Sequence, residues 1–542
     1  MNLSNYTQIF LFLFIQTNIN MKKHFSLLIL LFSIVIETLA QVNNTAVNYM
    51  QYIDPSDLNK HLSIFASDEF EGRETGKKGQ KMAAEYLKNE FQKMGLVNVS
   101  DEGPYQTYKL HEKVLGKRLL EINQTEFKIA DDFFPTKELE QIAIQSNEIY
   151  FVGYGINESN YNSFQGLDIK GKVVVVLAGE PMPKGKYMLN AEGKSKWSNS
   201  SKKIEEIKKY NPSLIVYVDP NYKKYIKYYK HKLESSGLKL AYKESKDTEI
   251  PVIVCNESVA NALLAPNKKT LAKLQSKLSK SPSASKPIKL KSTIKTDIQF
   301  LNQDVYAENV LAMVEGSDKA DEYIFITAHY DHIGVIDGEV HNGADDDGSG
   351  TVALLEIAQA FIEAKKAGVG PRRNIVFMAV SGEEKGLLGS EYYTDHPIIP
   401  LDATIANLNI DMIGRIDEKH NDDSNYVYII GSDKLSSELH MINEEANKTV
   451  NLNLDYTYND PKDPNMFYYR SDHYNFAKNN IPIIFYFNGV HEDYHKAGDE
   501  VSKIHFPMLA KRAQLVYLTA WELANREQRI VVDKTNDFPA EK

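Results

Sequence analysis

The sequence predicts an α/β protein with a mostly parallel central sheet flanked by helices. Three observations carry this prediction. Strands and helices alternate between residues 300 and 530, which places helices on both faces of a parallel sheet. Polar residues follow the ends of these strands, where such sheets bind their ligands. A separate stretch, from about 140 to 290, is rich in strands and has no acid, base or metal cluster, so we expect an inserted second domain.

The composition is that of a globular protein large enough for two domains. The chain has 542 residues, of which 42% are apolar and 25% are charged. Its net charge of −10 argues against binding nucleic acid, which requires a basic surface. Cys255 is the only cysteine, so no intramolecular disulfide can form, and its apolar neighbours predict a buried thiol. The composition leaves the oligomeric state open.

The first forty residues follow the order of a secretory signal peptide. Lys22 and Lys23 precede an apolar run over 26–36, and residues 38–40 supply the small side chains of a cleavage site. Met21 lies directly before the lysines and is a second candidate for the residue at which translation starts. Because the run is short for a membrane span, we expect a secreted or periplasmic protein without stable membrane insertion. An uncleaved membrane anchor is the alternative.

Hydrophobic periodicity predicts the elements in order along the chain. Apolar residues recur at three- and four-residue steps over 77–94, which predicts a helix that Gly95 ends. A stretch rich in Lys and Ser, 267–297, predicts a linker with an exposed strand. The remaining expected strands span 148–153, 172–177, 214–218, 252–254, 323–327, 374–379, 405–410 and 483–487, and the remaining expected helices span 350–364 and 506–526.

Histidines and carboxylates cluster at the predicted strand ends. The first strand of the third part runs into Ala328-His329-Tyr330-Asp331, and Gly343–Gly348, with three aspartates, precedes the next helix. The later strands lead to Ser381–Glu384, to Asn409–Asp411 and to the loop with Tyr494-His495. A single histidine or Glu-Glu pair would usually be structural or solvated. Four such ends on successive strands indicate one shared site.

A metal site explains this set better than a bare cluster of acids. Buried carboxylates repel one another and raise each other's pKa, and cations remove that penalty. A mixed set of His, Asp and Glu suits zinc, with cobalt or manganese as substitutes. The sequence therefore predicts a metal-dependent enzyme.

These motifs resemble peptidase family M28, the zinc aminopeptidases of the co-catalytic type. The resemblance rests on several motifs at the strand ends and on one before the last strand. They are Ala328–His332, Gly343–Gly350, Ser381–Glu384, Asn409–Asp411, Tyr494-His495 and, before the last strand, Arg470-Ser-Asp-His473. The motifs occur in the family's order over about 300–530. The upstream segment Glu69–Arg73 and its helix also fit the family. The fold implied is that of the zinc exopeptidases, which is phosphorylase/hydrolase-like.

The resemblance implies a two-zinc site. Asp346 would bridge both ions, Glu384 and His495 would complete one site, and His329 and Asp411 would complete the other. Glu383 would act as the general base toward a water activated by the two ions.

Two further aspartates are implied as orienting residues. Asp331 would accept a hydrogen bond from the second ring nitrogen of His329, and Asp499 would act similarly beside His495. Mild departures from the family pattern, Asp347-Gly348 and the segment 496–499, leave the ligand set intact. The expected substrates are peptides with a free N-terminus.

One sequence pattern is set aside. His491-Glu-Asp-Tyr-His495 matches the zinc-protease pattern H-E-x-x-H, which requires a helix. Glycines at 489 and 498 and the preceding strand predict a loop instead, so His491 and Glu492 are left out of the site.

The middle block resembles a protease-associated (PA) domain through 151–155 and 166–172. In M28 enzymes that domain is non-catalytic. The expected organisation is a signal peptide over 1–40, an N-terminal segment packing on the peptidase domain over 41–139, the PA-like insert over 140–295, the catalytic domain over 296–530 and a tail over 531–542.

Other functions on the same scaffold stay open at this point. A carboxypeptidase- or dipeptidase-type relative would differ only in its specificity pocket. A single-zinc glutaminyl cyclase is a further alternative, although the aspartate pair 345–346 beside His329 and Asp411 favours two metals. An inactive peptide-binding protein would lack a ligand, and every expected ligand is present.

Overall fold

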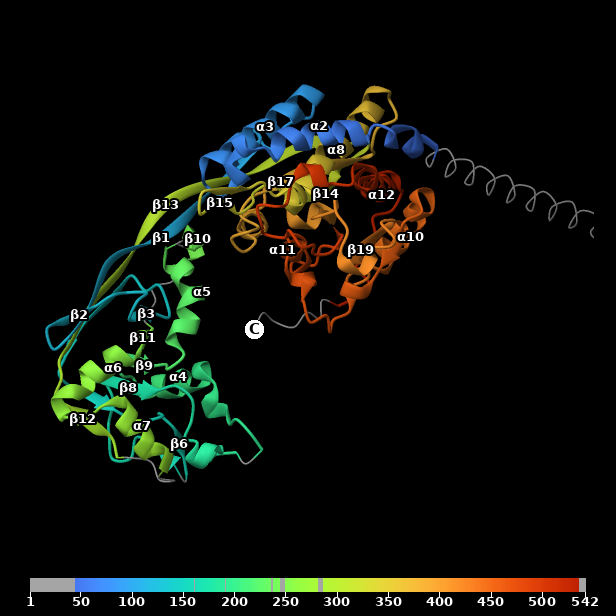
Figure 1. Ribbon diagram of the computed structural model, residues 1–542. Helices are drawn as coiled ribbons and strands as arrows, with labels where there is room; N and C mark the ends of the chain where they lie inside the picture. Colours follow the sequence, from blue (N-terminus) through green and yellow to red (C-terminus); the bar gives the residue numbers. More distant parts are fainter. Residues whose placement is uncertain are drawn as a thin grey trace, which may run out of the picture. The chain divides into compact units, whose positions relative to one another are not determined.

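The computed structural model describes residues 44–159, 161–190, 192–234, 237–243, 249–280 and 286–535. The predicted signal peptide over 1–40 lies outside the described residues. The chain divides into two compact units, Met1–Tyr108 with Tyr306–Lys542 and Lys109–Val305 (Figure 1). No helix within the described ranges is long and apolar enough to cross a membrane.

The first unit is built on the predicted sheet. Strand order is β13-β17-β14-β18-β21-β19-β20. The central pairs β17/β14, β14/β18 and β18/β21 are parallel, whereas β13/β17 and β19/β21 are antiparallel. The mostly parallel sheet is thus confirmed, with antiparallel strands toward its edges. The strands are β13 (Ile294–Val314), β17 (Arg373–Val380), β14 (Lys319–His329), β18 (Thr404–Ile410), β21 (Ile483–Phe487), β19 (Tyr426–Ile430) and β20 (Asn453–Asp455).

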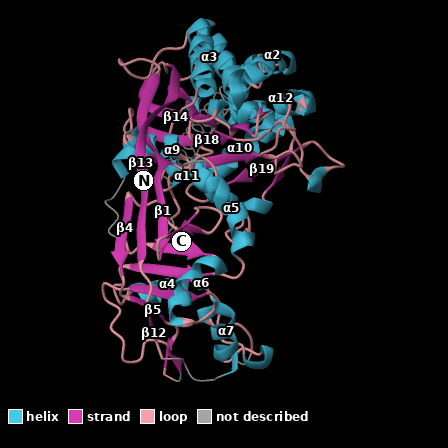
Figure 2. Cartoon of the chain, turned by 60° about the vertical axis from the view of Figure 1, so that its left-hand side comes forward, coloured by secondary structure: helices cyan, strands magenta, loops and turns pink. Residues whose placement is uncertain are grey.

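Helices cover both faces of this sheet (Figure 2). Along β14, Ile324 and Ile326 belong to one hydrophobic cluster and Phe325 to another, because successive side chains in a strand point to opposite faces. The first cluster includes residues of α2, α3, α8, α10 and α12, and the second includes residues of α9 and α11. These helices are α2 (Pro55–Phe65), α3 (Lys78–Met94), α8 (Gly350–Lys366), α9 (Leu388–Asp395), α10 (Ser437–Val450), α11 (His473–Ala477) and α12 (Phe506–Asn525).

The second unit contains its own six-stranded sheet, in the order β12-β5-β8-β9-β11-β3. All four strands predicted in the middle block are present, and Cys255 is buried at the end of β11. Burial raises the pKa of the Cys255 thiol, in keeping with a structural role. The elements are β3 (Phe133–Pro135), β5 (Ile149–Phe151), β8 (Val173–Leu177), β9 (Leu214–Val218), β11 (Val252–Cys255), β12 (Ile288–Leu290), α4 (Ser200–Lys208), α5 (Tyr222–Glu234), α6 (Glu257–Leu264) and α7 (Leu271–Lys280).

Two expectations for this region are corrected. The unit spans 109–305 rather than 140–295, because β3 pairs with β11 and so ties residues before 140 to the second sheet. Within 267–297, where a linker with a strand was expected, Leu271–Lys280 form α7, whose Leu271, Leu274 and Leu278 are buried at helical spacing. The strand β12 also lies in this stretch. The likeness of this unit to a PA domain stays a prediction.

Candidate metal centre

The predicted site residues gather at one edge of the first unit's sheet. His329 is the last residue of β14, and Asp411 directly follows β18. Glu383 and Glu384 lie in the turn after β17, and His495 lies in the turns after β21. Because these strands are neighbours and parallel, their carboxyl ends meet.

Asp346 lies between two groups of side chains. One oxygen, Oδ1, is 3.2 Å from His329 Nε2, and the other, Oδ2, is 3.2 Å from His495 Nε2. Asp346 comes from the turn Ala344–Ser349 that leads into α8 and is buried. Its two oxygens therefore face different histidines, as a bridging carboxylate requires.

The first group surrounds His329. Its Nε2 is 3.6 Å from Asp411 Oδ1 and 3.8 Å from Glu383 Oε2. His329, Glu383 and Asp411 can each offer one ligand atom within 4.8 Å of the others. The structure thus brings His329 and Asp411 together with the expected general base.

The second group surrounds Glu384. Its Oε2 is 3.1 Å from His495 Nε2, and its Oε1 is 2.8 Å from Nδ1 of His332. The ring of Tyr494 stacks on His495 with 3.9 Å between centroids. His332, Asp346 and Glu384 also offer ligand atoms within 4.8 Å of one another. His332 is a site residue that the sequence analysis did not predict, although it is visible as the second histidine of the motif 328–332.

The electrostatics of the two groups suit a cation. Burial, Glu384 and Asp411 raise the pKa of Glu383 well above its usual value, against the opposing effect of His329. Burial and Asp346 also oppose ionisation of Glu384, yet His332 and His495 lower its pKa to about 2. Charged groups this deeply buried need opposite charge beside them.

The residues present fit a metal. Asp346 Oδ2 and Glu384 Oε1 are buried and have no hydrogen-bond partner among the described residues. Buried polar atoms rarely stay unsatisfied, so atoms that converge without hydrogen bonds indicate a missing common partner. Two imidazoles flanked by carboxylates form the donor set that zinc prefers.

Asp331 supports the site differently from the expectation. His329 Nδ1 lies 3.0 Å from the backbone oxygen of Asp331 and 3.8 Å from its carboxylate. The carboxylate instead accepts from Thr75 Oγ1 at 2.6 Å and from the Glu383 backbone N–H at 3.3 Å. Asp331 therefore orients His329 through its backbone and braces the turn of Glu383 through its side chain.

Asp499 also differs from the expectation. Its carboxylate accepts hydrogen bonds from the backbone N–H groups of Asp345 and Asp346 at 3.0 and 3.1 Å. It thus holds the turn that carries Asp346 and is not hydrogen-bonded to His495. His491 contacts Asp345, with Nε2 3.3 Å from the carboxylate, and residues 492–495 form turns rather than a helix.

Asp347 explains one departure from the family pattern. Its carboxylate accepts from the backbone N–H groups of His329 at 3.2 Å, Gly350 at 2.9 Å and Met412 at 3.0 Å. These three groups belong to β14, α8 and the end of β18. Asp347 therefore fixes the strand ends that carry His329 and Asp411.

The comparison with known proteins agrees with this geometry. Residues 309–520 match Peptidase family M28, and the matched stretch contains all five expected ligands. These residues form an M28 peptidase domain. Aminopeptidase YwaD of Bacillus subtilis (strain 168) is 33% identical over 139 residues, which cover 24% of this chain and 28% of YwaD.

A second relative of the M28 domain is the probable glutamate carboxypeptidase LAMP1 of Arabidopsis thaliana. It is 33% identical over 118 residues, or 21% of this chain and 16% of LAMP1. The matched stretches thus span less than a third of each of these two relatives. The solved aminopeptidase from Aneurinibacillus sp. strain AM-1 has a TM-score of 0.51 and 16% identity, covering 92% of this chain and all of that protein. This likeness shows the fold.

A small cavity adjoins the metal centre of the M28 domain. Its volume is about 30 Å³, and Asp346, Glu383 and Asp411 form its acidic side. The rest of its lining is mainly apolar and comes from Met412, Phe467, Arg470, Phe485, Phe487, Val490 and Tyr494.

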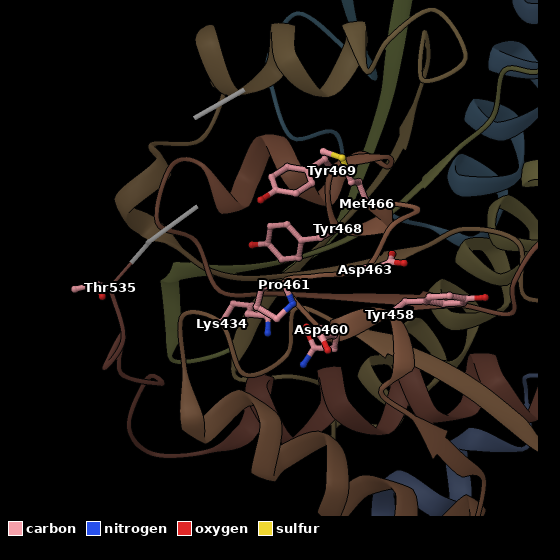
Figure 3. Close-up of a pocket in the computed structure, with 10 residues that line it drawn as sticks. Lys434, Tyr458, Asp460, Pro461, Asp463, Met466, Tyr468, Tyr469 and Thr535 are labelled. Carbon is pink, nitrogen blue, oxygen red and sulfur yellow. The ribbon is translucent and has the colours of Figure 1, made fainter. Parts of the chain in front are cut away.

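A second pocket, of about 180 Å³, is lined by the same segment of the chain. Tyr468 and Tyr469 line it with Met466 and Tyr458 (Figure 3). The rings of Tyr468 and Tyr469 lie 5.3 Å apart. Because Phe467 lines the smaller cavity, side chains of consecutive residues line two different pockets.

Proposed function

We propose that the chain is a zinc-dependent aminopeptidase that removes N-terminal residues from peptides, using two ions. The observation that carries this proposal is the position of Asp346, which presents one oxygen to His329 and the other to His495. A carboxylate shared in this way suits two adjacent ions rather than one.

Five side chains would hold the ions. His329 and Asp411 would bind one, Glu384 and His495 would bind the other, and Asp346 would contact both. When bound, such a pair supplies Lewis acid chemistry, which activates a water and stabilises developing negative charge. Cobalt or manganese would serve as substitutes.

Glu383 would act as the general base. Its carboxylate lies beside the first group, with Oε2 3.8 Å from His329 Nε2, and it lines the small cavity. Burial and nearby carboxylates raise its pKa in the metal-free chain. Cations bound beside it would favour the ionised carboxylate, which is the form that accepts a proton. Glu383 would take the proton from water and return it to the leaving amine.

The charge of the cavity favours a free amine in the substrate. Asp346, Glu383 and Asp411 together line one side of it, and an ammonium group would be attracted there. The two groups of ligands, rather than one, favour hydrolysis over the single-zinc cyclase reaction. Arg470 also lines the cavity, and its positive charge would attract a free substrate carboxylate, as the carboxypeptidase alternative requires.

Hydrolysis of a substrate panel tests this proposal. Aminoacyl-p-nitroanilides and their N-acetylated forms would be compared with N-blocked dipeptides, with and without a chelator, beside a metal count. We expect chelator-sensitive cleavage of free-amine substrates only. Cleavage of blocked dipeptides alone would instead support the carboxypeptidase alternative. A chain that is inactive on all substrates and binds no metal would support a binding protein.

We also propose that the protein is exported and that the second unit is a non-catalytic, PA-like domain. The basic, apolar and small residues that follow one another over 22–40 support export. Mass spectrometry of the exported protein's N-terminus tests it. A mature chain that begins near Gln41 is expected, and retention of residues 22–40 would support the membrane anchor.

A further inference from the structure

His332 is a buried histidine of the metal centre that is not one of the five proposed ligands. It follows His329 by three residues and has no exposed surface. Its Nδ1 is 2.8 Å from Glu384 Oε1 and 3.9 Å from Asp346 Oδ2. His332 therefore faces the two carboxylates that the proposed function assigns to the second ion.

The close contact between His332 Nδ1 and Glu384 Oε1 does not meet the angular geometry of a hydrogen bond, although the imidazole still lowers the pKa of the carboxylate. Neither His332 Nδ1 nor Glu384 Oε1 has a correctly oriented partner among the described residues, and both atoms are buried. A hydrogen bond weakens steeply when donor and acceptor are misaligned, so distance alone does not explain the contact. Two ligand atoms aimed at a common point would approach each other in this way.

Packing holds the imidazole in this direction. Gly343 has a left-handed φ of +54°, and a Cβ at this position would lie 2.5 Å from Cγ and Cδ2 of His332. The absence of a side chain at Gly343 therefore makes room for the ring. On another side, the ring meets His495 at 5.9 Å between centroids in an edge-to-face arrangement. The ring is thus fixed with Nδ1 toward Glu384.

We propose that His332 is a fourth protein ligand, through Nδ1, of the ion held by Asp346, Glu384 and His495. This inference rests on the proposed two-ion function. Four protein donors complete a tetrahedral zinc site, whereas catalytic sites keep a position open. With His332 added, this ion would have four protein donors and would be the more tightly bound of the two. The ion beside His329 and Asp411 would have fewer protein donors and would keep an open position.

Metal binding by matched variants tests this assignment. His332→Ala and His332→Gln remove the proposed ligand, and Asp411→Asn weakens metal binding at the other position. His440→Ala is the control, because His440 lies in α10 and contacts Ser432. Zinc content and affinity would be measured by chelator competition, and cobalt-loaded protein by visible absorption. Circular dichroism would check that each variant is folded.

We expect the unaltered chain to bind two ions, one more tightly than the other. Both His332 variants should lower the affinity for the more tightly bound ion by at least about 100-fold. Even the loss of a residue that only supports a metal ligand lowers metal affinity by about 10–100-fold. The strong absorption of tetrahedral cobalt should fall, and added imidazole should restore it in His332→Ala. Asp411→Asn should keep that absorption, and His440→Ala should match the unaltered chain.

The outcomes separate this inference from the proposed function. If the His332 variants bind both ions with unchanged affinity and cobalt absorption, His332 is not a ligand and the aminopeptidase proposal stands. If the unaltered chain binds no metal, both proposals fail. A His332→Ala protein that loses both ions equally, without rescue by imidazole, would contradict a site-specific ligand.

Discussion

Arg73 donates a hydrogen bond from Nη2 to the backbone oxygen of Gly343 at 2.9 Å. The same guanidinium donates to the backbone oxygens of Tyr330 at 2.8 Å, Asn342 at 2.7 Å and Phe65 at 3.1 Å. Arg73 is fully buried and joins the N-terminal segment to the strand end and the loop on either side of the metal centre. This relationship explains why Glu69–Arg73 belongs to the same sequence pattern as the ligands.

Replacing Arg73 should destabilise the first unit more than it alters the second. Burial lowers the pKa of Arg73 to about 10, so it stays charged at neutral pH. We expect Arg73→Ala to lower the free energy of unfolding by about 3–5 kcal/mol, because four buried carbonyls lose a charged donor. Arg73→Lys should recover little, since lysine lacks the planar fork.

Denaturant unfolding, followed separately for the two units, measures this effect. Arg529→Lys is the matched control, because Arg529 is exposed and donates to one backbone oxygen, that of Asp402. A stable Arg73→Ala protein would show that the carbonyls are satisfied in another way.

The sequence predicted most of the strands and helices at the centre of the first unit. It also placed the five expected ligands at the strand ends where the two groups of side chains lie. Strand ends such as His329 and Asp411 could be read from the sequence because the apolar runs before them are continuous and parallel strands share an edge. The helix α7 was missed because lysines and serines outnumber Leu271, Leu274 and Leu278 in its stretch.

Hydrogen-bond partners were harder to predict than positions. Asp331 and Asp499 were placed at the site, but their carboxylates bind backbone N–H groups, whose direction depends on turn geometry. His332 was missed for a related reason. After a strand ends, side chains no longer alternate between two faces, so the sequence does not show that His332 faces the carboxylates as His329 does.

Removing the charge of Glu383 should abolish most activity without loss of metal. We expect Glu383→Gln to lower kcat by about 10²–10⁴-fold, the usual contribution of a general base. Zinc content should stay at the unaltered level, because the expected ligands are other residues. The control Glu363→Gln changes a carboxylate in α8 that binds Lys366. If Glu383→Gln loses both activity and zinc, Glu383 is instead a metal ligand.

Stability should fall with rising pH because of Glu356, far along α8 from the metal ligands. Burial, together with Asp57 and Asp54, raises its pKa from 4.5 to about 8. The folded chain therefore holds a proton that the unfolded chain releases between these values. Stability from this group is complete below pH 4.5 and declines up to pH 8, by about 1.4 kcal/mol for each pH unit.

Glu356→Gln isolates that contribution. Burial lowers the pKa of His61, whose Nε2 is 3.6 Å from Glu356, so His61 offers no compensating charge at neutral pH. We expect the variant to raise the melting temperature at pH 8 and to change it little at pH 4.5. Equal effects at both pH values would mean that Glu356 is ionised throughout.

Metal removal should destabilise the first unit. Without a cation, the buried carboxylates of Asp346 and Asp411 lie close to that of the half-buried Glu383, so the apo protein must take up protons or lose stability. Zinc at about 1,000 times its Kd should stabilise the fold by about 4 kcal/mol, since it binds the folded state. Calorimetry of chelated and zinc-loaded protein measures this shift. The doubly substituted His329→Ala/His495→Ala chain should show little stabilisation by zinc. If zinc does not change the melting temperature of the unaltered chain, the proposed metal centre is contradicted.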